Sequence, residues 1–445
     1  MDSGARSTRP LVLRPGEAGY DDELAGFQTG FAQRPDVVFA AAGTDDVVAA
    51  VTYAAEASLP IGVQATGHGL PDASRGGVLI STRRMDEVAV NPAARTARIG
   101  AGVRWGQVVA AAAEHGLAPL NGSAPSVGAV SYTLGGGLGV LAREFGYAAD
   151  QVRSVELVTA DGTVRHVTAS SDPELFWGLL GGGANLGVVT GLTFGLVPVA
   201  RLYGGALAFD GREVEPAAIL RAYVEWTGGL SDEVTSSLSA LVYPDLPMLP
   251  ASLRGRYLVT VRVASTGSAA DGERLVAPLR AIGPAASDSL REMPYTESHT
   301  IHGDPDFPHA YYGESRMLDG LDTAGLEQVL ARTGPAAERM HVVQLNHLGG
   351  ALARPAGNAV PHRDARWLLR VLSPLDGTDR EALREFYAGT LTGVRQHVIG
   401  RSLNFTFASG DRTGGLYDAG TRERLAGLKA SYDPANLFRR NYGVG

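Results

Sequence analysis

The chain has no cysteine and almost no lysine among its 445 residues. Without cysteine it cannot build a disulfide scaffold, a thiolate metal site or a cysteine nucleophile. Lys429 is its only lysine, and we interpret the excess of arginine as genomic composition bias. Because the formal net charge is −8 at pH 7, we expect no nucleic-acid partner, which would require a basic patch.

Long apolar runs are also missing. No stretch approaches the ~18 consecutive apolar residues that a membrane span needs, so no membrane partner is expected. Residues 1–10 lack the apolar core of a secretory signal. The simplest expectation is a cytoplasmic protein, either a monomer or a homodimer.

Glycine, by contrast, is abundant, with 58 residues. Hydrophobic residues make up 44% and charged residues 19%, which is an ordinary globular composition, and the length favours two domains. So much glycine is typical of tight turns and of backbone that lies very close to a ligand. Glycine-rich segments next to predicted strands are therefore candidate binding sites.

The most informative segment is residues 61–70, I-G-V-Q-A-T-G-H-G-L. Residues 37–41 are predicted to form a strand, followed by a helix with Thr44 as its N-cap and an end at Pro60. The next strand then runs directly into a histidine between two glycines, His68. This strand-helix-strand unit therefore presents His68 in an approachable turn, although a turn histidine without a ligand is the simpler alternative.

Two further glycine-rich segments follow, at residues 121–139 and 181–194. Backbone N–H groups in such turns form concavities that bind anions, so three of them favour a large cofactor with a pyrophosphate. None contains the Gly-Lys-Ser/Thr of a phosphate loop. The segment at 181–194 runs into a strand instead of a helix, which excludes the Rossmann fingerprint.

The second half of the chain has a different pattern. Strands are predicted at residues 205–209, 234–242, 256–264, 342–348, 366–372 and 403–407. Helices are predicted between some of them, at residues 216–227, 273–282, 324–332 and 380–391. This order predicts an antiparallel sheet with helices on one face. Hairpins are predicted earlier in the chain, over residues 91–92 and 161–162.

Three motifs carry a family resemblance: V-Q-A-T-G-H-G at 63–69, P-S-V-G-A-V-S-Y-T-L-G-G-G-L-G at 125–139 followed by G-Y-A-A-D-Q-V at 146–152, and Y-D-P-A-N-L-F-R-R-N at 432–441. In this order they resemble the p-cresol methylhydroxylase/vanillyl-alcohol oxidase superfamily of FAD proteins, specifically its berberine bridge enzyme-like branch. The resemblance implies a two-domain α+β fold of the PCMH type. We expect an FAD-binding domain at residues 1–200, a substrate domain at 201–408, and a segment at 409–445 that returns to the FAD domain.

The resemblance also implies that His68 is bonded to the 8α-methyl group of FAD. Many relatives add a second bond from a cysteine, and that position falls on Ala124, so a single link through His68 is expected. Singly, each glycine could be an ordinary turn. As a set, the resemblance places these further residues at FAD: Ala65, Thr66, Gly67, Gly69, Leu70, Ala124, Ser126, Val127, Gly128, Leu134, Gly137, Gly139, Gly187, Val188, Val189 and Asn441.

On the substrate side, many relatives that oxidise alcohols carry Y-x-N on a strand facing the flavin, with the tyrosine as base. Here the matching segment is 402–405, with Ser402 at the tyrosine position and Asn404 retained. Asn404, Gln344 and Tyr311 are the candidate catalytic residues. Gln344 and Asn346 share one strand face, which could line a pocket or simply be solvated.

Tyr311 ends a segment, residues 297–312, that is rich in proline, glycine and histidine. A metal site at His299 and His302 with Asp304 is an alternative there, but we expect no metal and favour a substrate-entry loop.

The expected function is that of an FAD-dependent oxidase. Its substrate would be a small organic molecule or a secondary metabolite, which gives hydride to flavin N5 before O2 reoxidises the flavin. A flavin-dependent monooxygenase or a redox-neutral cyclase on the same fold is the alternative, because Ser402 has no useful pKa for proton abstraction. A non-catalytic ligand-binding protein with the same fold is a third alternative.

Overall fold

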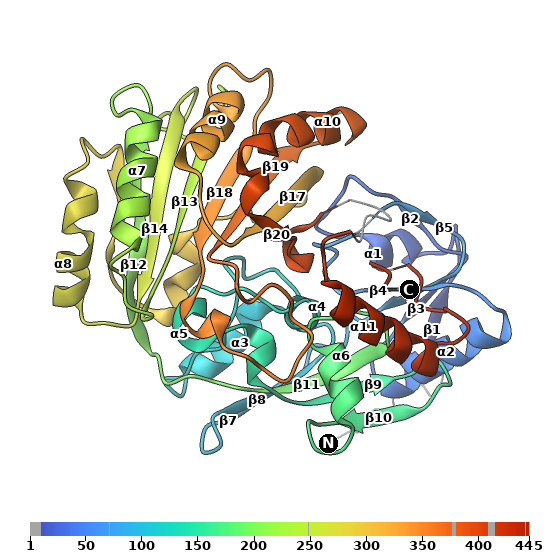
Figure 1. The fold of residues 1–445 in the computed structure, drawn as a ribbon. Helices are drawn as coiled ribbons and strands as arrows, with labels where there is room; N and C mark the ends of the chain where they lie inside the picture. The colour runs from blue at the N-terminus through green and yellow to red at the C-terminus, as the bar shows by residue number, and fades with distance from the viewer. Residues whose placement is uncertain are drawn as a thin grey trace.

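The computed structural model describes residues 10–70, 72–247, 249–375, 380–407, 414–440 and 442–444. Three main sheets form two lobes, with the first 200 residues in one lobe and the largest sheet in the other (Figure 1). Over the described ranges, no helix combines the length and the apolar character that crossing a membrane requires.

The first sheet has four strands in the order β1 (Leu11–Leu13), β3 (Val37–Ala40), β6 (Val78–Ser81) and β4 (Ile61–Gln64). Helix α2 (Thr44–Glu56) connects β3 to β4, and both strands run parallel to β6. The predicted strand-helix-strand unit is therefore present, and β4 leads into the His68 turn. The predicted N-cap is wrong: Gly43 occupies that position, and the Thr44 hydroxyl instead donates to Glu156 at 2.7 Å.

The second sheet is antiparallel, with the order β10 (Val164–Val167), β9 (Val152–Val158), β11 (Val188–Gly195), β8 (Thr96–Gly100) and β7 (Val88–Asn91). Both predicted hairpins are confirmed, because β7 pairs with β8 and β9 pairs with β10. This lobe also contains α1 (Tyr20–Leu24), α3 (Trp105–Ala113), α4 (Ala129–Leu134), α5 (Ala142–Phe145), α6 (Pro173–Leu179) and a short pair, β2 (Gln33–Arg34) with β5 (Ser74–Arg75).

The third sheet is antiparallel and follows the order β15 (Ser287–Asp288), β12 (Arg201–Asp210), β14 (Tyr257–Ser265), β13 (Val234–Val242), β18 (Val342–His347), β19 (Trp367–Pro374), β17 (Tyr311–Leu318) and β20 (Val398–Gly400). A further strand, β16 (Arg291–Pro294), also pairs with β12. Apolar residues of one sheet face form a core with the helices α7 (Pro216–Thr227), α8 (Ala269–Arg280), α9 (Thr323–Thr333) and α10 (Arg380–Thr390). The predicted antiparallel sheet with helices on one face is confirmed (Figure 1).

Two predicted features of this lobe are wrong. Residues 403–407 do not form a strand, because Leu403–Phe405 is a 3₁₀ helix, η5. The carbonyl of Ser402 accepts hydrogen bonds from the Phe405 amide at 3.2 Å and the Thr406 hydroxyl at 2.8 Å, which closes a turn. Strand β17 is absent from the predicted strands, although its first residue, Tyr311, donates a hydrogen bond to the other lobe.

The C-terminal segment returns to the first sheet. After α11 (Ala419–Tyr432), the Asp433 carboxylate accepts from the amides of Leu437 at 2.7 Å and Phe438 at 2.9 Å, and it pairs with buried Lys429 at 2.9 Å. Leu437 and Phe438 are buried in the core of the first sheet, and the Leu437 carbonyl accepts from the Ile61 amide at 2.8 Å. From these contacts we propose domain boundaries at residues 200 and 408.

Candidate functional site

The turn that carries His68 is fixed by the segment before β2. Gly67 has a φ of +69°, and a Cβ at this position would lie 2.8 Å from the Cα of Gly26, so only glycine fits. The amide of Phe27 donates to the carbonyl of Thr66 at 2.9 Å. Backbone packing of this kind holds the histidine at a defined place after β4.

The His68 imidazole lies between an aromatic ring and a hydroxyl. The Phe27 ring stacks on it with 3.8 Å between ring centroids, and Nε2 lies 3.1 Å from the Ser126 hydroxyl. Burial, reinforced by the charge of Arg104, lowers the pKa of His68 to about 4. The ring is therefore neutral at pH 7 and keeps one nitrogen lone pair available.

The first two glycine-rich segments meet at this turn. The amide of Gly128 donates to the Thr66 hydroxyl at 3.2 Å, which brings residues 124–128 beside residues 65–70. The amides of Gly67, His68 and Gly69 donate to no protein acceptor in the described residues. A Cβ added at Gly69 would meet nothing within 4 Å, so space is open beside these amides. Free amides around an open space suit the pyrophosphate of a dinucleotide.

The remaining glycine positions lie so close to a ring or to other backbone that no side chain would fit. A Cβ at Gly137 would lie 2.5 Å from the Tyr132 ring, and a Cβ at Gly139 would lie 2.7 Å from the Asn121 carbonyl oxygen. A Cβ at Gly187 would lie 2.8 Å from the Val158 carbonyl oxygen. Residues Leu134, Val188 and Val189 are buried around these contacts.

Several predicted FAD contacts stay predictions. Ala65, Leu70, Ala124 and Val127 lie in the two turns that meet at His68. Asn441 lies outside the described residues. The turn at residues 65–70 fits FAD in its donors and in its space: the amides at 67–69 would face the pyrophosphate and His68 would face the ring system.

The three candidate catalytic residues have structural partners. The Tyr311 hydroxyl donates to the His68 carbonyl, and burial raises the Tyr311 pKa well above its ordinary value, so this side chain connects the lobes and stays protonated. Asn404 donates to the Tyr132 carbonyl at 2.9 Å. Gln344 accepts from Arg370 on the neighbouring strand. The structure thus brings Tyr311 to His68, and Asn404 to the segment that carries Gly135.

Two arginines near these residues, Arg262 on β14 and Arg370 on β19, were not predicted as site residues. Each is the single charged residue of an otherwise largely apolar strand, Y-L-V-T-V-R-V-A-S and W-L-L-R-V-L-S-P. A lone arginine in the middle of such a strand is the signal that could have found them.

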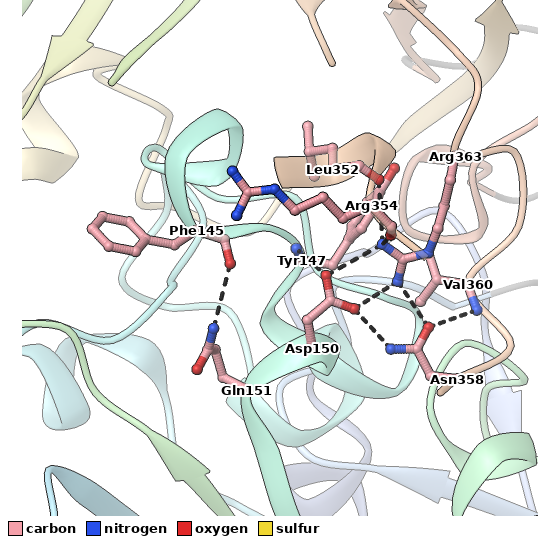
Figure 2. Close-up of polar contacts among 9 residues, drawn as sticks. All are labelled: Phe145, Tyr147, Asp150, Gln151, Leu352, Arg354, Asn358, Val360 and Arg363. Atoms are coloured by element: carbon pink, nitrogen blue, oxygen red, sulfur yellow. Dashed lines mark hydrogen bonds and ion pairs between the residues drawn. The ribbon is translucent and has the colours of Figure 1, made fainter. Parts of the chain in front are cut away.

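The G-Y-A-A-D-Q-V motif holds a different contact, shown in Figure 2. Asp150 pairs with Arg363 at 2.6 Å, and Asn358 bridges both side chains. The Arg363 guanidinium lies 5.0 Å from the centre of the Tyr147 ring. This largely buried cluster ties residues 146–152 to the segment before β19.

Comparison with known proteins agrees with this geometry. Residues 35–168 match the model of the FAD binding domain family. The chain is 29% identical to (R)-6-hydroxynicotine oxidase of Paenarthrobacter nicotinovorans, over 97% of this chain and 96% of that protein. The solved structure of 6-hydroxy-D-nicotine oxidase from Arthrobacter nicotinovorans superposes with a TM-score of 0.85 at 26% identity, covering 100% of both chains.

A plant protein shares the fold. Berberine bridge enzyme-like 1 of Physcomitrella patens has a TM-score of 0.82 at 20% identity, covering 96% of this chain and 95% of that chain. The family match, the full-length relative and the shared fold agree with the three motifs. The chain therefore carries an FAD binding domain, is similar over its full length to FAD-linked oxidoreductases, and is an FAD-dependent oxidoreductase.

Proposed function

We propose that the protein is an oxidase that uses O2 to oxidise a small organic molecule, with FAD attached through His68 alone. The observation that carries this proposal is a neutral imidazole in a turn with three free amides and open space beside them. The similarity to (R)-6-hydroxynicotine oxidase supports oxidase chemistry on a small organic substrate.

The residues around His68 favour a single covalent link. Bonding to a carbon atom requires an unprotonated imidazole nitrogen, and the lowered pKa keeps the ring in that form at neutral pH. The Ser126 hydroxyl and the Phe27 ring hold the imidazole in one orientation. Because the chain contains no cysteine, and Ala124 stands at the family's cysteine position, a second thioether link is impossible.

When bound, FAD supplies the acceptor for the two electrons that leave the substrate. The protein holds the His68 turn against the substrate domain through Tyr311, whose hydroxyl is committed to the His68 carbonyl. Asn404 donates to the Tyr132 carbonyl and so fixes η5 against α4. These contacts set the position of the substrate domain relative to the cofactor site.

The oxidase proposal is tested with the flavin itself. We expect the holoenzyme, reduced with dithionite without oxygen, to regain its flavin absorbance within seconds to minutes of mixing with aerated buffer, with release of hydrogen peroxide. A reduced flavin that persists in air would contradict O2 as the acceptor and would favour a dehydrogenase.

Ser402 favours a second candidate. A serine hydroxyl cannot serve as the base that the family tyrosine provides, because its pKa is far above neutral pH. A monooxygenase or a redox-neutral cyclase does not require that base. Product mass distinguishes the three reactions: loss of two hydrogens for an oxidase, gain of oxygen for a monooxygenase, and no change for a cyclase.

A further inference from the structure

The face of the nine-stranded sheet opposite the helices is polar. Register pairs Ser237 with both Arg262 and Asn346, and it pairs Gln344 with both Ser239 and Arg370. Residues paired across antiparallel strands point to the same face, as do residues two apart on one strand, so all six side chains share this face. The alternate positions of these strands carry the apolar core under the helices, namely Leu238, Ala240, Val261, Val263, Val343, Leu345, Leu369 and Val371.

This polar face lies toward the His68 turn. Arg370 pairs with Ser315 on β17, and Tyr311, four residues earlier on the same face, reaches the His68 carbonyl. From the other lobe, the Ser123 hydroxyl donates to the Asp304 carboxylate. Ser123 lies three residues before Ser126, the serine that contacts His68. The arginines therefore lie on the side of the substrate domain that meets the proposed flavin site.

Both arginines have only neutral partners in the described part of the chain. Arg262 donates to the Ser239 hydroxyl, and its buried Nε has no hydrogen-bond partner. Arg370 donates to Gln344, and its guanidinium lies 4.2 Å from the centre of the Phe405 ring. Neither forms an ion pair with a carboxylate among the described residues, unlike the largely buried Arg363.

The surroundings leave positive charge uncompensated. The Arg262 and Arg370 side chains keep some contact with solvent, but the surrounding protein lowers the pKa of both guanidinium groups, that of Arg370 to about 10. Both side chains therefore stay charged at pH 7. The Asp304 carboxylate interacts electrostatically with both arginines. Burial and the charge of Arg262 lower the pKa of His302, which disfavours a second positive charge on its ring. Among the described residues neither arginine forms an ion pair with Asp304, and a charge that is largely shielded from water and unpaired is costly.

We propose that Arg262 and Arg370 bind a carboxylate group of the substrate, so that the enzyme oxidises an organic acid. Planar guanidinium groups match the geometry of a carboxylate and form charge-assisted hydrogen bonds with it. This inference rests on the proposed oxidase function and names the class of its substrate. The pyrophosphate of FAD is the other anion near this region, but the free amides for it lie on the other lobe, at residues 67–69.

The test uses three small carboxylates, acetate, benzoate and phenylacetate, each compared with its neutral amide. Binding to the holoenzyme is followed by the change in flavin absorbance and by the melting temperature. We expect at least one acid to bind about tenfold more tightly than its amide, since the amide lacks the charge that the arginines attract. Arg370→Gln and Arg262→Gln should each remove most of this preference, and Arg370→Lys should retain part of it.

Arg274→Gln is the matched control, because it removes the same charge from a side chain that is 72% exposed on α8. It should leave the preference unchanged. The proposal is overturned when no acid is preferred over its amide, or when the preference survives both glutamine variants. Loss of FAD from those variants would assign the arginines to the cofactor instead. Absence of flavin from the wild-type protein would contradict the oxidase function itself, and measuring flavin content first separates that failure from the others.

Discussion

At the scale of single residues, the His68 turn depends on what surrounds one imidazole and one glycine. The Phe27 ring, the Ser126 hydroxyl and Arg104 set the position and charge of His68. Gly67 allows the chain to pass Gly26 at a distance that no side chain would permit. The motif predicted the turn, but Phe27 and Arg104 could not be predicted as its neighbours because they come from distant parts of the chain.

Gly67→Ala should destabilise the protein by at least about 2 kcal/mol, because a positive φ strains an alanine and its Cβ would collide with Gly26. The free energy of unfolding from urea titration measures this loss. Gly69→Ala is the matched control, since its Cβ meets no protein atom within 4 Å. Equal stability of the two variants would show that the close approach of Gly67 to Gly26 does not matter.

At the scale of secondary-structure elements, sequence patterns correctly predicted the elements whose conformation depends on residues close together in the chain. The turns at residues 91–92 and 161–162 predicted two hairpins, and both strand pairs form, β7 with β8 and β9 with β10. The prediction failed at residues 403–407, because a contact with β17 determines the backbone conformation there. The Ser402 amide donates to the Ser315 hydroxyl at 3.0 Å, and no local pattern contains that partner.

The cluster in Figure 2 gives a prediction for an element contact. Arg363→Ala would leave the Asp150 carboxylate, whose side chain is 15% exposed, without its cation. We expect a loss of about 3 kcal/mol in the free energy of unfolding, since removing one partner strands a largely buried charge. Faster proteolysis of the segment before β19 should accompany this loss.

Arg201→Ala serves as the comparison, because it breaks an exposed pair with Glu292. Exposed pairs contribute little, so this variant should unfold like the wild type. If both variants lost the same stability, the contact between Asp150 and Arg363 would have no special role in joining the segments.

At the scale of the whole molecule, the length and the family resemblance predicted the two-domain α+β architecture, and the strand pattern of the second half predicted its antiparallel sheet. The sequence could not predict how the large sheet orders its strands. Ser237, Arg262, Gln344 and Arg370 come together only through the register of β13, β14, β18 and β19. The polar face toward the His68 turn is therefore a property of the assembled sheet.

Buried neutral histidines make stability depend on pH. Burial lowers the pKa of His341 to about 4 and that of His347 to about 3, below the unfolded value near 6.5. Between these values the unfolded chain binds protons that the folded protein does not, so stability falls as the pH drops from about 6.5 toward 4. Urea titrations at pH 7 and pH 5 should show this loss.

His341→Gln should reduce that loss by about 1–2 kcal/mol, because the variant no longer takes up a proton at this position on unfolding. The wild-type ring is 2% exposed, with Nδ1 2.6 Å from the Ser373 hydroxyl. Exposed His115→Gln should leave the loss unchanged. A pH dependence that is the same in the wild type and His341→Gln would contradict the neutral buried state.

Attachment of FAD to His68 is tested most directly by acid precipitation of the purified protein, followed by mass analysis of its peptides. We expect flavin colour to stay in the pellet and the mass of FAD to map to the peptide that contains His68. His68→Ala should release all flavin into the supernatant. Flavin that dissociates from the wild-type protein on precipitation, or that maps to another residue, would contradict a single link through His68.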